Sequence, residues 1–325
     1  MILGFLRWLY PSVLLGAFVF FFAVSVASHF RNDYPVNPLN LLVFLAQWSA
    51  LEWMLAVVLG LFVALNGVMV FVPEIFYDAL VYHLPVPYYY LFHHGIKEMP
   101  FLAFSTMSQF VHLLWTWPMA IGSPSEMMTK FVHFSAGVAQ FVALYGFIRG
   151  RFGRIAGLLA GLFYYSVLCM PLISWTSGID LVNNFMATLA LLSIYHWRRE
   201  PRPSWWVASA VFCGFLIASK YTAIFGLFGL GLVWLTYQVI VRFRRGEDTV
   251  KSIALRCLGA FAIIMALWSP WIIKNTCSIG NPFHPFFLGQ LGDQNINPNR
   301  IEHPSSLTVG SPLEALSWSW KRFLT

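Results

Sequence analysis

The fold is decided by long apolar stretches such as residues 41–72, which read LLVFLAQWSALEWMLAVVLGLFVALNGVMVFV. A helix needs about 20 mostly apolar residues to cross the hydrocarbon core of a bilayer. Six further stretches have this character and little strand-like alternation, which favours helices over a barrel. They are residues 13–28, 127–148, 155–173, 181–197, 205–241 and 252–273.

The overall composition excludes a soluble globular protein. Hydrophobic residues make up 58% and charged residues 10% of the 325 residues, and the mean hydropathy is +0.68. A soluble domain is about 45–50% apolar and about 25% charged, and its cores could not cover this much apolar surface. We therefore predict an all-α, polytopic helical membrane protein with about seven to nine spans. Residues 1–325 would form a single transmembrane domain.

The formal net charge of +7 is concentrated in three short loops between apolar runs. A nucleic-acid surface is one interpretation, but this placement favours cytoplasmic loops, which carry an excess of Lys and Arg. We expect no nucleic-acid partner. The clusters are Arg149, Arg151 and Arg154; Arg198, Arg199 and Arg202; and Arg242, Arg244, Arg245, Lys251 and Arg256.

With these loops inside, the order of the spans places the other connections outside. Residues 73–126 become a first external loop, in which we read 99–121 as an interfacial helix rather than a span. Residues 205–241 must begin and end inside, so we expect two short helices with an outer turn at 218–222. Residues 174–180 form a further outer turn.

The two ends of the chain are less determined. Either the N-terminus lies outside and residues 41–72 form one tilted helix, or it lies inside and that stretch is a hairpin. We divide the chain into an N-terminal span region (1–51), a central module (52–290) and the start of a C-terminal region (291–325). The last region shows no clear span, which leaves open that the chain is part of a longer protein.

The segment 73–85 holds the densest candidate chemistry. On a helix, Glu74, Asp78 and Tyr82 share a face, and His83 follows directly. A carboxylate at a membrane surface lies in a low effective dielectric, which strengthens its attraction for a hydroxyl or a cation, and it suits a general base. The alternative is that Asp78 caps a helix within an interfacial belt of tyrosines.

Three other residues are candidates on the same outer side. Asp180 precedes the span 181–197, where it either caps the helix or faces a cavity with Asp78. Lys220 suits a phosphate, as a point charge, or it extends to the membrane surface from a helix end. His284, in a turn-rich loop, either lines the mouth of a site or packs there. The four cysteines suggest neither a disulfide framework nor a zinc site, and we assign no metal ligands.

Five short motifs in this order give the chain a family resemblance. The sequence resembles the membrane-embedded glycosyltransferases of the GT-C superfamily, near the protein mannosyltransferase and aminoarabinose transferase-like group (glycosyltransferase family 39-like), over residues 52–290. The motifs are YDALVYHLP (77–85), GIDL (178–181), ASKYT (218–222), PWIIKN (270–275) and GNPFHPF (280–286).

The resemblance implies transfer of a hexose or pentose from a polyprenyl-phosphate carrier to a lipid, glycan or protein at the outer or lumenal face. Asp78 matches the essential acidic residue of the family. Some relatives have a second acidic residue beside it, where this chain has Ala79, so the resemblance leaves the need for a divalent metal open. Lys220 matches a family position near the donor, where phosphate binding is a plausible role. We assign substrate binding to Glu74, Tyr82, His83, Asp180, Lys220 and His284.

The expected location is the bacterial inner membrane rather than the endoplasmic reticulum. Two other functions stay open from the sequence: a flippase or transporter of a lipid-linked substrate, and a non-catalytic membrane subunit. Transporters often show inverted repeats, and we find no internal repeat here.

Overall fold

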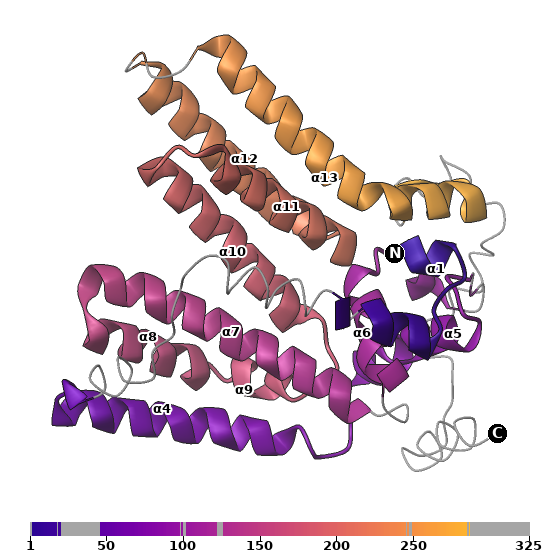
Figure 1. Cartoon of the computed structure of the whole chain (residues 1–325), viewed down its shortest axis with the longest axis horizontal. Helices are drawn as coiled ribbons and strands as arrows, with labels where there is room; N and C mark the ends of the chain where they lie inside the picture. The colour runs from indigo at the N-terminus through magenta and orange to yellow at the C-terminus, as the bar shows by residue number, and fades with distance from the viewer. Residues whose placement is uncertain are drawn as a thin grey trace.

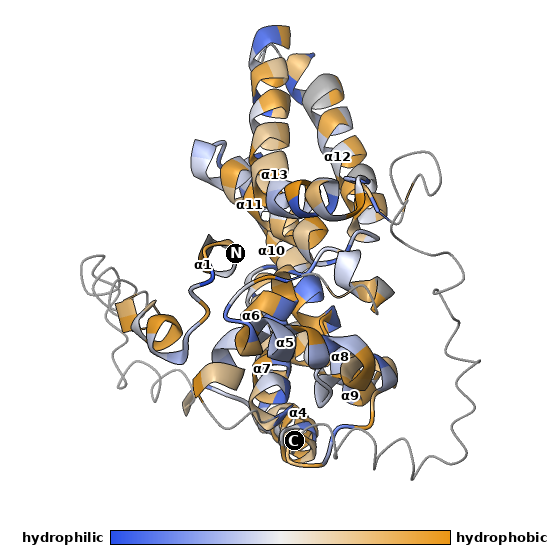
Figure 2. Cartoon of the chain, turned by 90° about the vertical axis from the view of Figure 1, so that its right-hand side faces the viewer, coloured by the Kyte–Doolittle hydropathy of each residue, from blue (hydrophilic) through white to orange (hydrophobic). Residues whose placement is uncertain are grey.

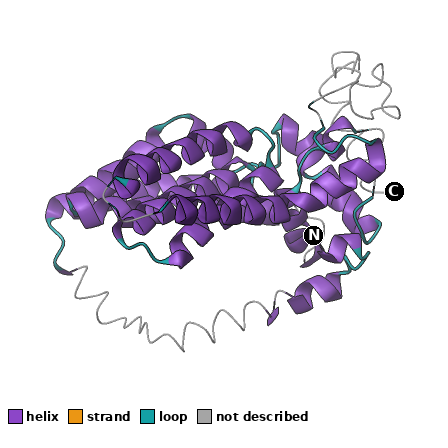
Figure 3. Ribbon diagram, turned by 90° about the horizontal axis from the view of Figure 1, so that it is seen from above, coloured by secondary structure: helices purple, strands orange, loops and turns teal. Residues whose placement is uncertain are grey.

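The computed structural model describes residues 2–17, 19–20, 46–97, 99, 102–121, 126–244, 246, 249–284 and 286. Within these residues the regular elements are all helices, with no strand (Figure 3). This confirms the all-α prediction. Most of the expected span 13–28, and all of the C-terminal region 291–325, lie outside the described residues.

Seven helices form the body of the molecule (Figure 1). Three of them, α4, α7 and α13, are long and apolar enough to cross a membrane. The seven are α4 (Ala50–Met69), α7 (Glu126–Phe152), α8 (Arg154–Ser166), α10 (Asp180–Arg199), α11 (Pro203–Ser219), α12 (Ala223–Tyr237) and α13 (Val250–Ile279).

Helix α4 settles how the stretch 41–72 folds in its described part. Ser49 and Glu52 form a capping box that starts the helix, which then runs unbroken to Met69. A hairpin within residues 50–69 is therefore excluded. The interpretation of 41–72 as one helix is also wrong, because residues 47–49 are not helical and α4 begins only at Ala50. Glu52 also pairs with Arg154 at 2.7 Å, which ties the start of α4 to that of α8.

The expected division of 205–241 into two helices is confirmed, since α11 ends at Ser219 and α12 begins at Ala223. The stretch 155–173, in contrast, is not one helix, because α8 ends at Ser166 and a short α9 (Cys169–Ser174) follows. Pro171 gives the physical reason. It has no N–H to bond the carbonyl of Val167, and its ring disfavours a continuous helix through this point.

Short helices gather at one end of the bundle, which we call the site end (Figure 1). The stretch 99–121 does not form one helix there, and its 12-residue helix α6 is too short to span a membrane. A core that includes Leu9, Tyr90, Leu113 and Trp271 joins these helices to the N-terminal segment and to α13. The short helices at the site end are α1 (Ile2–Phe5), η1 (Ala79–His83), α5 (Pro85–Phe92), η2 (Ala103–Thr106) and α6 (Phe110–Ile121).

The three basic loops lie at the opposite end, which we call the arginine end (Figure 1). The guanidinium groups of Arg242 and Arg256 lie 5.1 and 5.5 Å from the ring centre of Trp197 at the end of α10. Arg151 similarly contacts the ring of Tyr195. The separation of the two ends is what the charge-based topology predicts.

The sides of the bundle are apolar and several polar groups are inside. Helix α4 exposes large hydrophobic side chains along its length, among them Trp53, Leu61, Leu65 and Val68, and Figure 2 shows hydrophobic residues along the outer helices. Polar side chains such as His133 and Gln140 are buried. An apolar surface of this extent is stable in contact with lipid but not in contact with water, so the chain is an integral membrane protein.

Candidate active site at the site end

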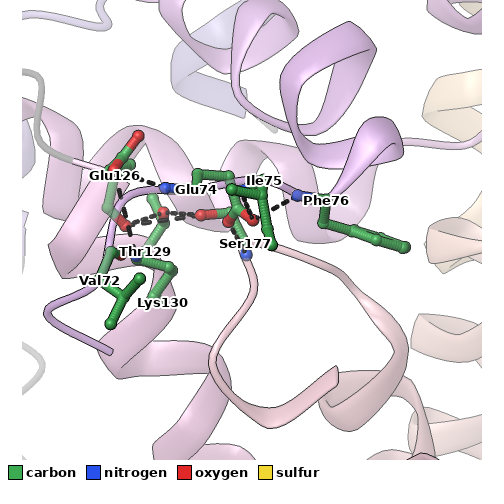
Figure 4. A network of polar contacts seen from close by, with 8 residues as sticks. All are labelled: Val72, Glu74, Ile75, Phe76, Glu126, Thr129, Lys130 and Ser177. Atoms are coloured by element: carbon green, nitrogen blue, oxygen red, sulfur yellow. Dashed lines mark hydrogen bonds and ion pairs between the residues drawn. The ribbon is translucent and has the colours of Figure 1, made fainter. Parts of the chain in front are cut away.

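Glu74 fixes the loop that follows α4 (Figure 4). Its buried carboxylate accepts backbone N–H bonds from Ile75 and Phe76, at 3.1 and 3.0 Å, and from Ser177 at 2.6 Å. Its own backbone N–H donates to the carboxylate of Glu126 at 2.9 Å. Hydrogen bonds to a charged acceptor are among the stronger ones in proteins. The expected substrate-binding residue Glu74 therefore joins two loops that are far apart in sequence.

The contact between these two loops also includes a buried lysine, which was not predicted from the sequence as a site residue. The ammonium of Lys130 donates to the carbonyl of Val72 and lies 4.0 Å from the Glu126 carboxylate. The hydroxyls of Thr129 and Ser177 lie 2.8 Å apart. These contacts hold the start of α7 against both the 73–78 loop and the 174–180 turn (Figure 4).

Asp78 stands at the start of η1 and is half-buried. It occupies the N-cap position of η1, as one interpretation of the sequence expected, but its side chain makes no capping hydrogen bond. Burial, and then the charge and hydrogen bond of the Asp78 carboxylate, raise the pKa of Tyr82. The hydroxyl of Tyr82 thus keeps its proton, and its ring stacks on Phe104 at 4.4 Å between centres.

Asp180 and Lys220 form an ion pair, with Oδ1 and Nζ 2.9 Å apart. Asp180 is the first residue of α10, and the N-cap residue Ile179 makes no side-chain cap. Instead, the ring nitrogen Nε2 of His133 accepts the backbone N–H of Leu181 at 3.0 Å. His133 thus satisfies one backbone N–H of the first turn, while the carboxylate of Asp180 pairs with Lys220.

The ion pair stands at a pocket of about 420 Å³ between α10, α11 and α12. This volume is within the range of about 300–1,000 Å³ common for small-molecule sites. Polar groups cluster near the ion pair, and aliphatic side chains complete the wall. The lining includes Asp180, Asn183, Asn184, Lys220 and Thr222 on the polar side and Leu191, Leu216, Leu227 and Leu230 on the apolar side.

His83 contacts a partner residue that could not be identified from the spacing of residues in the sequence. Its Nδ1 lies 2.7 Å from Nε2 of His112 on α6, and both rings are buried. Burial first, and then His112, lower the pKa of His83, so the ring is neutral. Among the residues that the structure describes, no group of three or more His, Cys, Asp or Glu side chains is arranged to hold a metal.

His284 lies in a second region of the site end where segments distant in sequence are in contact. Its Nδ1 lies 2.8 Å from the hydroxyl of Thr106, and the amide of Asn275 donates to the Thr106 carbonyl at 2.7 Å. The same loop places Phe286 against the ring of Tyr221, with centres 5.3 Å apart. The tail of α13 therefore lies beside the turn that carries Lys220.

The structure thus brings several predicted residues together from segments far apart in sequence. The charges of Asp78 and Asp180 both act on Tyr82, and that of Lys220 acts on His83. Sequence reasoning missed the partner roles of His112, His133 and Lys130. A usable signal existed, since ionisable residues within apolar stretches tend to be functional or paired.

The fold and the site define a helical integral membrane protein with its ionisable groups gathered at one end. The sequence model of the dolichyl-phosphate-mannose-protein mannosyltransferase family matches residues 109–273, about half of the chain, and the chain belongs to this family. It is a membrane glycosyltransferase of the GT-C type. Asp180 and Lys220 lie inside the matched segment, and Asp78 precedes it. Neither the curated proteins nor the solved structures gave a match.

Proposed function

We propose that this protein transfers a sugar from a polyprenyl-phosphate carrier to an acceptor hydroxyl at the external or lumenal face of its membrane. The observation that carries the proposal is the Asp180–Lys220 pair at the edge of a pocket that is polar on one side and apolar on the other. A carrier with a charged head and a hydrocarbon tail has the same division of chemistry.

In this reaction the acceptor oxygen forms a bond to the anomeric carbon of the donor sugar. The bond from that carbon to the phosphate oxygen breaks, and its electron pair leaves with the prenyl phosphate. Asp78 accepts the proton of the acceptor hydroxyl as general base. Lys220 stabilises the phosphate charge through N–H donors beyond the one directed at Asp180.

The other residues have supporting roles in this proposal. Tyr82 donates to Asp78 and orients it. Glu74 holds the loop that carries Asp78 against the turn that carries Asp180, and His83 and His284 position the neighbouring segments.

The test uses the full chain in proteoliposomes with prenyl phosphates that carry radiolabelled mannose, glucose or aminoarabinose. Membrane extract supplies the acceptors, with and without EDTA. The readout is the loss of label from the lipid-linked donor into a new product, so the acceptor need not be identified beforehand. Movement of the labelled lipid across the bilayer without transfer would instead identify a flippase, and a nucleotide sugar as the preferred donor would contradict the proposal.

A further inference from the structure

Asn183 lies one helical turn below Asp180 on α10 and lines the same pocket. Residues three apart share a helix face, so Asn183 lies on the same side of α10 as the ion pair. Only 8% of the residue is exposed. Asn183 is therefore a buried polar group in the wall of a cavity.

Neither side-chain atom of Asn183 has a hydrogen-bond partner among the residues that the structure describes. Two other buried amides of the bundle, those of Asn66 and Gln140, are paired at both atoms. Asn66 donates to the carbonyl of Phe62 and accepts from Ser174, and Gln140 donates to Thr188 and accepts from Tyr164. Burial of an amide without hydrogen-bond partners costs about 1–3 kcal/mol of folding free energy. Asn183 therefore does not stabilise the free protein.

The two free atoms define what a ligand must offer. The amide Nδ2 donates and the Oδ1 accepts, so one ligand that satisfies both must itself accept and donate. A phosphate diester at neutral pH only accepts, and a hydrocarbon chain does neither. Sugar hydroxyls do both. The neighbouring neutral groups of Asn184 and Thr222 in the pocket wall have the same dual character.

We propose that Asn183 recognises hydroxyl groups of the donor sugar, as a specificity-determining residue one turn deeper than the phosphate site at Lys220. This inference rests on the proposed function, since it requires a lipid-linked sugar in this pocket. It adds that the pocket distinguishes a glycosylated carrier from the bare carrier, and that this selectivity resides in Asn183.

The test measures the binding of two probes to the full chain in nanodiscs: undecaprenyl phosphate, and undecaprenyl phosphate that carries one mannose, with glucose and galactose forms as substitutes. Asn183→Leu should weaken the glycosylated probe about tenfold, which corresponds to about 1.4 kcal/mol, and leave the bare probe within about twofold. Asn183→Ala, which does not fill the space, should give the same selective loss if the leucine variant fails to fold. Asn183→Thr, which keeps a donor and an acceptor, should lose less.

Thermal unfolding separates recognition from a structural role. Replacing an unpaired amide by an isosteric apolar group is neutral or stabilising, whereas replacing a paired one is destabilising. Without ligand, Asn183→Leu should therefore melt at or above the wild-type temperature, and the matched control Asn66→Leu should melt below it and keep the preference for the glycosylated probe.

The outcomes distinguish this inference from the proposed function. An equal loss for both probes would place the phosphate at Asn183 and overturn the inference, as would unchanged binding or a melting temperature as low as that of Asn66→Leu. Each of these three results leaves the proposed function standing, because the wild-type protein still binds the carrier. If the wild-type protein binds no prenyl phosphate, with or without a sugar, both fail.

Discussion

Lys220 Nζ lies 2.9 Å from Asp180 Oδ1, although 40 positions separate the two residues in the chain. The side chains are 45% and 36% exposed. Exposed ion pairs contribute about 0–1 kcal/mol to stability. A pair in this position therefore matters more for what it presents to a ligand than for holding α10 to α11.

Replacement of the lysine tests this view. Lys220→Gln removes the charge that we assign to the donor phosphate, so affinity for undecaprenyl phosphate should fall at least about tenfold, with little change in melting temperature. The exposed pair between Glu200 and Arg202, 3.1 Å apart at the arginine end, is the matched control. Arg202→Gln should leave binding unchanged, and a similar loss in both variants would argue against a specific phosphate site.

Asp78→Asn tests the general base. The amide keeps the size of the side chain but cannot take a proton, and general-base catalysis is worth about 10²–10⁴ in rate. We expect sugar transfer to fall by about that factor while donor binding stays within about twofold. Tyr82→Phe should reduce transfer less, because it removes only the hydroxyl that orients Asp78. Near-normal transfer by Asp78→Asn would exclude the assigned role.

Glu74→Gln should damage the fold rather than one chemical step. Each hydrogen bond to a charged group contributes about 1.5–3 kcal/mol, and the Glu74 carboxylate accepts three. The melting temperature should fall clearly, and both donor binding and transfer should fall with it. Glu126→Gln loses a carboxylate that is 34% exposed, so its melting temperature should fall less. A stable Glu74→Gln that has lost only donor binding would instead favour direct substrate contact.

The His83–His112 contact predicts how stability depends on pH. Burial lowers the pKa of His83 below its ordinary value of 6.5, with His112, His133 and Lys220 adding charge repulsion. The unfolded chain binds a proton below pH 6.5 and the folded chain does not. Stability is therefore present above this pH and lost below it, by about 2 kcal/mol at pH 5.

Melting curves of wild type and His83→Gln between pH 7.5 and pH 5 measure this effect. The variant cannot titrate at this position, so its melting temperature should fall less steeply with pH, whatever its absolute stability. Parallel curves for the two proteins would mean that His83 takes up its proton in the folded state as well.

The two ends of the bundle should lie on opposite sides of the membrane. In a background with all four cysteines replaced by serine, Tyr77→Cys at the site end should react with an impermeant maleimide in intact cells. Phe152→Cys at the arginine end should react only after the membrane is opened. Both side chains are exposed, at 52% and 74%. Labelling in the reverse pattern would overturn the topology and, with it, the proposed face of action.

Much of the architecture followed from local sequence properties. The apolar stretches predicted α7, α10 and α13, and the loop charges predicted that 205–241 is two helices, because the stretch had to return to the side on which it began. The break at Pro171 could have been anticipated from its missing N–H, but the composition of 155–173 was read as one helix. Whether 41–72 was a helix or a hairpin could not be decided from apolar character, since both bury similar residues.

The sequence by itself determined that this is a helical membrane protein and which loops share a side, because hydrophobic length and loop charge act locally along the chain. It also picked out Asp78, Asp180 and Lys220 as unusual charges beside apolar spans. Only the tertiary structure decided their partners. Glu74 accepting from Ser177, His133 accepting from Leu181 and Lys220 pairing with Asp180 join residues 40 or more positions apart. Such contacts depend on how the helices pack against one another. The same packing leaves the side-chain amide of Asn183 without a hydrogen-bond partner within the described part of the chain.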